Sequence, residues 1–121
     1  MSTDWNPASV EAVIQETSDR IEKGVLDVDK AYREFLQKDL DFDIAEAKAY
    51  LRARENGEPA HTCEHHATLD SAEERLARNL ADAEYKLREK NMKALERKLD
   101  AYRSIGTSVR QAYAQGISGG L

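Results

Sequence analysis

The segment from Ser71 to Ala114 constrains the fold most strongly, because it contains no proline and only one glycine, Gly106. Apolar or aromatic side chains recur along it at steps of three and four residues, the spacing of one face of an α-helix. At 1.5 Å per residue, this helix would be roughly 65 Å long. Such a helix exceeds the width of a small domain, so one end must project or meet another chain. The stripe comprises Leu76, Leu80, Ala83, Leu87, Asn91, Leu95, Leu99, Tyr102, Ile105, Val109 and Tyr113.

The composition also favours helices over sheets. Of 121 residues, 34% are charged and 40% are apolar, with only two prolines and six glycines, as in long helices and coiled coils. Aromatic residues make up only 7%, so a chain this short buries its apolar stripes most readily against partner subunits. We therefore predict an all-α fold, a long helical hairpin with a short N-terminal helix, assembled into a homo-oligomeric, coiled-coil-like bundle.

We predict a single helical domain over residues 1–121. Its elements are an N-terminal helix over 1–27, a second helix over 28–54, a loop over 55–70, a long helix over 71–114 and a flexible tail over 115–121. Asn6 caps the first helix, Pro7 occupies its first turn, and Gly24 is its expected stop. Gly57 and Pro59 both break helices, which predicts the loop.

The second helix has an inward-facing apolar stripe of its own. The stripe comprises Val28, Tyr32, Phe35, Phe42, Ala45, Ala49 and Ala53. We expect Leu36, Leu40 and Leu51 to widen it on its flanks. Asp39 interrupts the stripe, so a bend or a change of packing partner is expected there.

The sequence favours a cytoplasmic location. Residues 1–5 are polar and acidic, without the apolar region of a secretory signal. No apolar run approaches the roughly 18 residues of a membrane span, so no membrane partner is expected. Cys63 is the single cysteine, which excludes an internal disulfide and suits a reducing compartment.

Charge is divided unevenly along the chain, whose net charge is −5. Residues 1–74 carry 8 Lys/Arg and 18 Asp/Glu, whereas residues 75–110 carry 10 Lys/Arg and 5 Asp/Glu. The basic segment is either a binding surface for an acidic ligand or the complement of the acidic helices within the same protein. The sequence leaves both interpretations open.

The basic residues of the long helix are candidates for contact with nucleic acid. An exposed face of Lys and Arg would follow a phosphate backbone without sequence preference, and Tyr85 and Tyr102 lie among them for stacking on bases. The alternative is an ordinary solvated face, with Tyr102 in the core. The basic residues of this helix are Arg75, Arg78, Lys86, Arg88, Lys90, Lys93, Arg97, Lys98, Arg103 and Arg110.

We assign the oligomer interface to the apolar stripe of the long helix. The assigned residues are Leu76, Leu80, Leu87, Leu95, Leu99, Tyr102 and Val109. Asn91 within this stripe either fixes the register of the assembly, as a buried Asn does in coiled coils, or faces solvent.

The segment 61–66 is the only cluster with reactive side chains. Imidazole and thiolate are preferred zinc ligands, which makes His61, Cys63, His65 and His66 weak metal candidates. Their spacing fits no standard zinc finger, and four ligands from six consecutive residues surround one ion poorly. The sequence has no phosphate loop and no nucleophile elbow. We expect no metal, no cofactor and no catalytic residues, hence a protein that is not an enzyme.

Several stretches of the chain resemble a known group of proteins. Residues 45–53 (AEAKAYLRA), 81–86 (ADAEYK) and 93–105 (KALERKLDAYRSI), ending in Ser108-Val109-Arg110, are similar in order to small tailed-phage proteins that resemble UvsY-type recombination mediators. The resemblance covers roughly residues 40–112. It implies a helical oligomer that binds single-stranded DNA and helps to load a RecA-like recombinase while displacing single-strand-binding protein.

From this resemblance we expect a phage recombination mediator acting in the host cytoplasm. The resemblance supplies no catalytic residues. The nucleic-acid contacts that it implies are Lys86, Arg88, Lys93, Arg97, Lys98, Arg103 and Arg110. The alternative is a non-enzymatic oligomeric adaptor or anti-defence protein, whose acidic half binds a host protein at that protein's nucleic-acid surface. Binding of DNA, as opposed to co-purification with a host factor, distinguishes the two.

Overall fold

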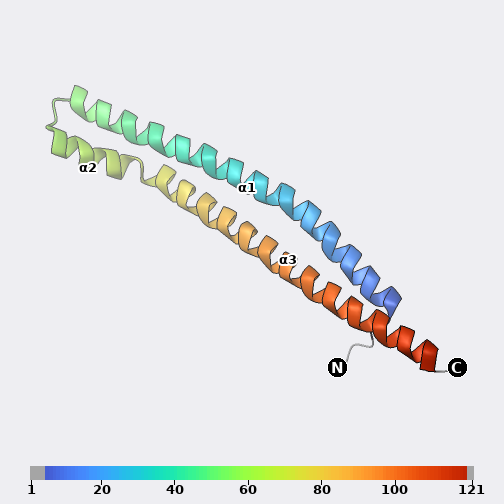
Figure 1. The fold of residues 1–121 in the computed structure, drawn as a ribbon. Helices are drawn as coiled ribbons and strands as arrows, with labels where there is room; N and C mark the ends of the chain where they lie inside the picture. The colour runs from blue at the N-terminus through green and yellow to red at the C-terminus, as the bar shows by residue number, and fades with distance from the viewer. Residues whose placement is uncertain (1–4, 120–121) are drawn as a thin grey trace. The chain divides into compact units, whose positions relative to one another are not determined.

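The computed structural model describes the backbone of residues 5–119 and the side chains of residues 5–116 (Figure 1). Its elements are α1 (Pro7–Glu55), α2 (Ala60–Asp70) and α3 (Ala72–Gly119). Within the described range there is no strand, which confirms the prediction of an all-α fold. No helix in this range is both long enough and apolar enough to cross a membrane.

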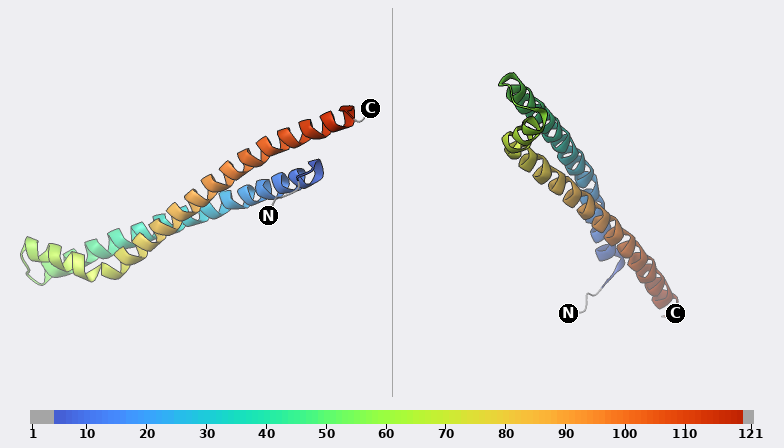
Figure 2. Two further views of the ribbon diagram at one scale, coloured as in Figure 1. Left: turned by 90° about the horizontal axis from the view of Figure 1, so that it is seen from below. Right: turned by 90° about the vertical axis from the view of Figure 1, so that its left-hand side faces the viewer.

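The chain divides into two compact units, each described here by itself. Unit 1 contains residues 1–26 and 89–121, and unit 2 contains residues 27–88. Unit 2 holds the connection of the helical hairpin, with the C-terminal part of α1 beside the first part of α3 (Figures 1 and 2). The prediction of a single domain over residues 1–121 stays a prediction.

The N-terminus of α1 is capped as expected. The backbone N–H of Ser9 donates to the Asn6 side-chain oxygen at 2.9 Å, and the Asn6 N–H donates to the Ser9 hydroxyl at 2.9 Å. This reciprocal pair satisfies two donors at the helix start, and Pro7 in the first turn has no N–H to satisfy. Residues 1–4, the start of the predicted N-terminal helix, lie outside the described residues.

The predicted stop at Gly24 is wrong, because α1 continues through it without interruption. A Cβ atom at Gly24 would lie 2.5 Å from the Met92 Cε atom, so the missing side chain is replaced by a neighbour from α3. A glycine costs only about 1 kcal/mol in a helix interior, which packing within unit 1 offsets. The predicted short N-terminal helix and second helix are therefore one helix.

The predicted loop over residues 55–70 is reduced to a tight turn. The Gly57 N–H bonds to the Arg54 carbonyl at 3.0 Å, and the Glu58 N–H bonds to the Ala53 carbonyl at 3.1 Å. Gly57 has φ of 82°, and this left-handed conformation closes α1 in a Schellman motif. Pro59 then precedes α2 directly. The prediction failed because nothing after Pro59 breaks a helix.

The predicted tail is also wrong over residues 115–119, because α3 continues to Gly119. Residues 120–121 lie outside the described residues. Gly106 does not break α3 either: it is buried in unit 1, and a Cβ atom there would lie 3.6 Å from Ile14 Cδ1 and from Val10 Cγ2. The close approach of these α1 side chains keeps Gly106 within the helix.

Gly106→Ala should raise the free energy of unfolding by about 1 kcal/mol, because alanine favours the helix by that amount. The new Cβ would stand at ordinary contact distance from Ile14 and Val10. Urea unfolding followed by circular dichroism measures the change. Gly116→Ala, at an open position of the same helix, is the control that reports helix propensity without a new contact. A lower stability for Gly106→Ala would contradict this packing.

The interior of unit 1 is mainly apolar, and its buried Thr17 hydroxyl donates to the Val13 carbonyl at 2.8 Å. Val10 is fully buried and Leu99 is 9% exposed. Ile14, Leu95 and Tyr102 are half-buried. Branched and aromatic side chains thus hold the two helix segments of unit 1 together by removing apolar surface from water.

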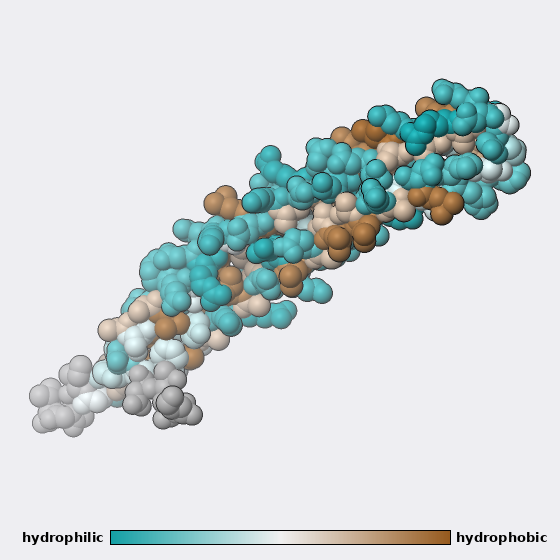
Figure 3. Space-filling model, turned by 180° about the vertical axis from the view of Figure 1, so that it is seen from behind, coloured by the Kyte–Doolittle hydropathy of each residue, from teal (hydrophilic) through white to brown (hydrophobic). Residues whose placement is uncertain are grey.

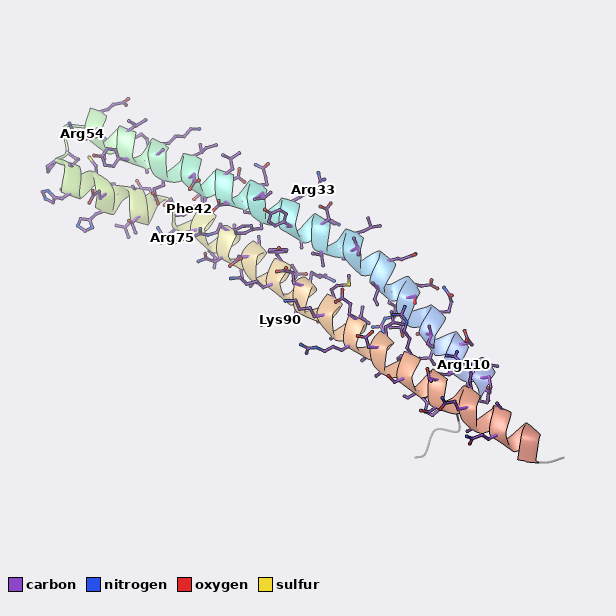
Figure 4. The ribbon with its side chains drawn as sticks, viewed as in Figure 1. Arg33, Phe42, Arg54, Arg75, Lys90 and Arg110 are labelled. Atoms are coloured by element: carbon purple, nitrogen blue, oxygen red, sulfur yellow. The ribbon has the colours of Figure 1, made fainter. Side chains whose placement is uncertain are left out.

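The interior of unit 2 is built from small and polar residues. Its buried positions are Ala31, Ala49, Ala53, Cys63, Ala67 and Ser71. Asp39, which interrupts the predicted apolar stripe, accepts from Arg78 of α3 at 3.3 Å. The Arg78 guanidinium also lies 4.8 Å from the centre of the Phe42 ring, and that of Arg75 lies 5.6 Å from it. Figure 4 shows Phe42 and Arg75 facing each other between the helices.

Candidate nucleic-acid interface

Three basic side chains form a row on one face of α3 in unit 1. Lys90, Lys93 and Arg97 follow one another at three and four residues, so they lie on the same side of the helix. All three are exposed, and none forms an ion pair with a residue that the structure describes. We call them the basic stripe. Lys98, also exposed and without an ion pair in the described part, lies beside Arg97.

The basic stripe points away from the interior of unit 1. With 3.6 residues per turn, it lies opposite the face of α3 that carries Leu95, Leu99 and Tyr102. Figure 4 shows Lys90 on the side of α3 away from α1. The stripe extends over about 10 Å of helix, a length that matches a few phosphates of one strand, spaced about 3.4 Å apart in a duplex.

The other basic residues predicted to bind nucleic acid are engaged in ion pairs. The pairs are Lys86–Asp82 at 2.9 Å, Arg88–Glu84 at 2.8 Å, Arg103–Asp100 at 4.0 Å and Arg110–Glu11 at 3.2 Å. Lys86 and Arg88 belong to unit 2, so only part of the predicted set is brought together with the basic stripe. Exposed pairs of this kind contribute about 0–1 kcal/mol each, so a phosphate can compete for them.

The acidic first half of the chain leaves the basic stripe uncovered. In unit 1, Glu11 of α1 pairs with Arg110, and in unit 2, Asp39 pairs with Arg78. Neither pair involves Lys90, Lys93 or Arg97. Among the described residues, the acidic first half therefore forms no ion pair with the basic stripe.

Lys90 is the one member of the stripe that was absent from the predicted contacts. Its position was readable from the sequence, because it precedes Lys93 by three residues and Arg97 by seven, which is one helical face. The predicted contacts were chosen by their resemblance to a protein family and not by the face of the helix on which they lie. Arg103 and Arg110 lie on a different side of α3 from the stripe.

The two tyrosines considered for base stacking pack within the protein. The Tyr85 ring lies 5.0 Å from Tyr32 and 6.4 Å from Phe35, centroid to centroid. The Tyr102 ring lies 6.1 Å from Trp5. Aromatic pairs at these separations are stabilising contacts. Both tyrosines therefore belong to the packing of the helices, which leaves only cations in the candidate interface.

The predicted oligomer interface is divided between the interior and the surface. Leu95, Leu99, Tyr102 and Val109 are buried or half-buried within unit 1. Leu76, Leu80 and Leu87 are exposed, and so is Asn91, which faces solvent. The apolar row of α3 consequently faces outward in unit 2 and inward in unit 1.

The weak metal candidates do not converge. Cys63 is fully buried in α2 and donates to the Glu58 carbonyl at 3.4 Å. His61 and His65 share an exposed face one turn apart, and His66 is half-buried on another. Among the described residues, no three His, Cys, Asp or Glu side chains group so that they could hold a metal ion.

Comparison with known proteins leaves the fold and the basic stripe as the basis for assigning a function. No protein-family model matches the chain, and no curated protein or solved structure matches it. The fold places the chain in the class of all-α proteins built on a long helical hairpin.

Proposed function

We propose that this protein binds single-stranded DNA through the basic stripe of α3 and acts without catalysis, as a homo-oligomer. The observation that carries the proposal is that Lys90, Lys93, Arg97 and Lys98 are exposed and unpaired within the described residues. Three cations on one outward face of the helix, Lys90, Lys93 and Arg97, with Lys98 on the adjoining side, attract a phosphate backbone whatever its base sequence. A single row of cations suits one strand.

The small number of contacts in one chain supports an assembly. Four cations release few counterions, so one subunit binds weakly at physiological salt. Subunits joined in an oligomer present several stripes to the same strand, and each further contact becomes intramolecular. Affinity then rises without any new kind of contact. This is why the proposal joins DNA binding to self-association.

The biological role proposed is that of a recombination mediator in the cytoplasm of a phage-infected host. It follows from the resemblance to UvsY-type mediators together with the basic stripe. The acidic part of α1 would contact the RecA-like recombinase or the single-strand-binding protein. Exposed carboxylates such as Glu16, Asp19 and Glu22 are available for this.

Fluorescence anisotropy of a labelled single-stranded oligonucleotide tests the proposal, with duplex as the control. We expect tighter binding to the single strand. The slope of log K against log salt should be about −3 for each subunit that uses four cations. Absence of binding at low salt would remove the DNA proposal. The chain would then be tested as an adaptor that binds a host protein through its acidic half.

A further inference from the structure

Unit 2 exposes two rows of large apolar side chains. The first, which we call the α1 seam, comprises Tyr32, Leu36, Leu40, Ile44 and Leu51. The second, the α3 seam, comprises Leu76, Leu80 and Leu87. Each of these side chains is between 41% and 62% exposed. Single exposed leucines are ordinary, but continuous apolar rows bordered by polar residues mark interaction sites.

The α1 seam corrects the prediction for the second helix. Leu36, Leu40 and Leu51 do not widen its inward stripe, since they are 46%, 52% and 59% exposed. The inward positions of α1 in unit 2 are instead those of Phe35, Phe42 and the buried alanines. Leu36 follows the inward-facing Phe35 by one residue, and Leu40 follows Asp39, which pairs with Arg78 of α3. Both leucines therefore point away from α3.

The two seams lie on opposite edges of unit 2. Apart from Tyr32, whose ring packs against Tyr85 of α3 at 5.0 Å, the seam residues face away from the helix that their own helix contacts. Figure 3 shows apolar side chains along both long edges of the part of the molecule formed by the hairpin connection, with polar ones between them. One neighbour at one edge therefore cannot cover both seams.

The seams also match in their position along the helix axes and in the direction of their helices. The ion pair between Asp39 and Arg78 fixes the level at which α1 and α3 run past each other in unit 2. Leu40 follows Asp39 by one residue, and Leu76 precedes Arg78 by two, so these leucines stand at similar levels on antiparallel helices. Leu36 and Leu80 lie one turn further along, again at similar levels.

We propose that the α1 seam of one copy packs against the α3 seam of a second copy. A copy placed beside the first in the same orientation brings Leu40 opposite Leu76 and Leu36 opposite Leu80 without an axial shift. The contact repeats the antiparallel pairing of α1 with α3 that the hairpin already contains. A second copy is therefore the occupant that has the right length, direction and apolar chemistry at both edges.

The charges beside the seams are compatible with this packing. On α1 the pair Asp29–Arg33 lies next to the seam, with atoms 2.9 Å apart. On α3 the pair Glu84–Arg88 lies next to Leu87. Each flank thus carries both signs, so neighbouring copies meet no field of a single sign.

The interface is heterologous, since one surface meets a different surface of the next copy. Such contacts close into a ring or continue as a filament, so the assembly is larger than a dimer. The seams belong to unit 2 and the basic stripe to unit 1, so self-association uses none of the cations proposed for DNA. The inference stands whether or not the protein binds DNA.

Two double variants of the full chain test it by sedimentation velocity and light scattering. The first carries Leu36→Glu and Leu40→Glu, and the second carries Leu76→Glu and Leu80→Glu. The wild type should form assemblies larger than dimers, and each variant alone should be monomeric. An equimolar mixture should form a 1:1 heterodimer, because one variant retains the α3 seam and the other retains the α1 seam. Tyr113→Glu, at an exposed residue of unit 1, should assemble like the wild type.

Three results would overturn the inference. They are a monomeric wild type, assembly of either double variant by itself, and a mixture that remains monomeric. Dimers of one double variant alone would indicate a symmetric contact of its remaining seam. Circular dichroism checks that the variants retain their helices. If a glutamate variant loses helicity, the corresponding double alanine variant replaces it, and it should likewise lower the mass of the assembly.

Discussion

Replacing Lys90, Lys93, Arg97 and Lys98 with glutamate should weaken binding of single-stranded DNA by at least about 100-fold at low salt. The change removes every cation of the basic stripe and its neighbour, and places four carboxylates where phosphates would lie. Because these side chains are exposed and unpaired in the described part of unit 1, the helices should stay folded. Anisotropy titrations at several salt concentrations measure the loss, and circular dichroism measures the fold.

A control with the same change of charge separates the basic stripe from net charge. The control reverses four exposed basic residues of α1 in unit 2: Lys30, Lys48, Arg52 and Arg54. If the stripe is the contact, the control should keep most of the affinity and the salt slope of the wild type. Equal losses in the two variants would mean that binding follows overall charge. Unchanged affinity in the first variant would exclude the basic stripe as the DNA site.

The helical class and the long C-terminal helix were predictable because they depend on local information. The spacing of apolar residues, the absence of proline after Ser71, and the Asn6 cap all act within a few residues. Such signals identify helices when they are summed over many residues. They also identified the turn at Gly57, whose φ of 82° suits glycine.

The errors came from features that depend on contacts distant in sequence. Gly24 resembles a helix stop, but Met92 fills the space beside it. Nothing near Gly24 in the sequence reports that neighbour. Local propensity is a weak signal of about 1 kcal/mol per glycine, which a single tertiary contact offsets. Gly106 is likewise kept within its helix by contacts distant in sequence, since Val10 and Ile14 approach it.

The basic chemistry of the candidate site was predictable from the sequence, but the set of residues that forms the site was not. The sequence gives the basic character of residues 75–110, and helical spacing groups Lys90 with Lys93 and Arg97. It does not show which cations are paired, because the Arg110–Glu11 contact joins residues almost a chain length apart. It also does not show which face of α3 is inward in each unit, since that depends on how α1 packs there.

The apolar row of α3 is buried in unit 1 and exposed in unit 2, so the same substitution should have different effects on stability at two leucines of this row. Leu99→Glu should destabilise unit 1 by about 3–5 kcal/mol, because it buries a charge without a partner. Leu87→Glu should change the free energy of unfolding by less than about 1 kcal/mol, because surface substitutions have small effects. Leu99 is 9% exposed and Leu87 is 51% exposed.

The two variants differ only in where the same change is made, since glutamate is a good helix former at either position. Urea unfolding followed by circular dichroism, at a protein concentration low enough to limit assembly, measures the difference. Comparable losses at the two sites would mean that the row is buried along its whole length, as the sequence pattern alone suggests. A loss confined to Leu99 would show that the row changes from surface to interior along α3. Leu87 would then be free of any role in the stability of the single chain, as the proposed contact with a second copy requires.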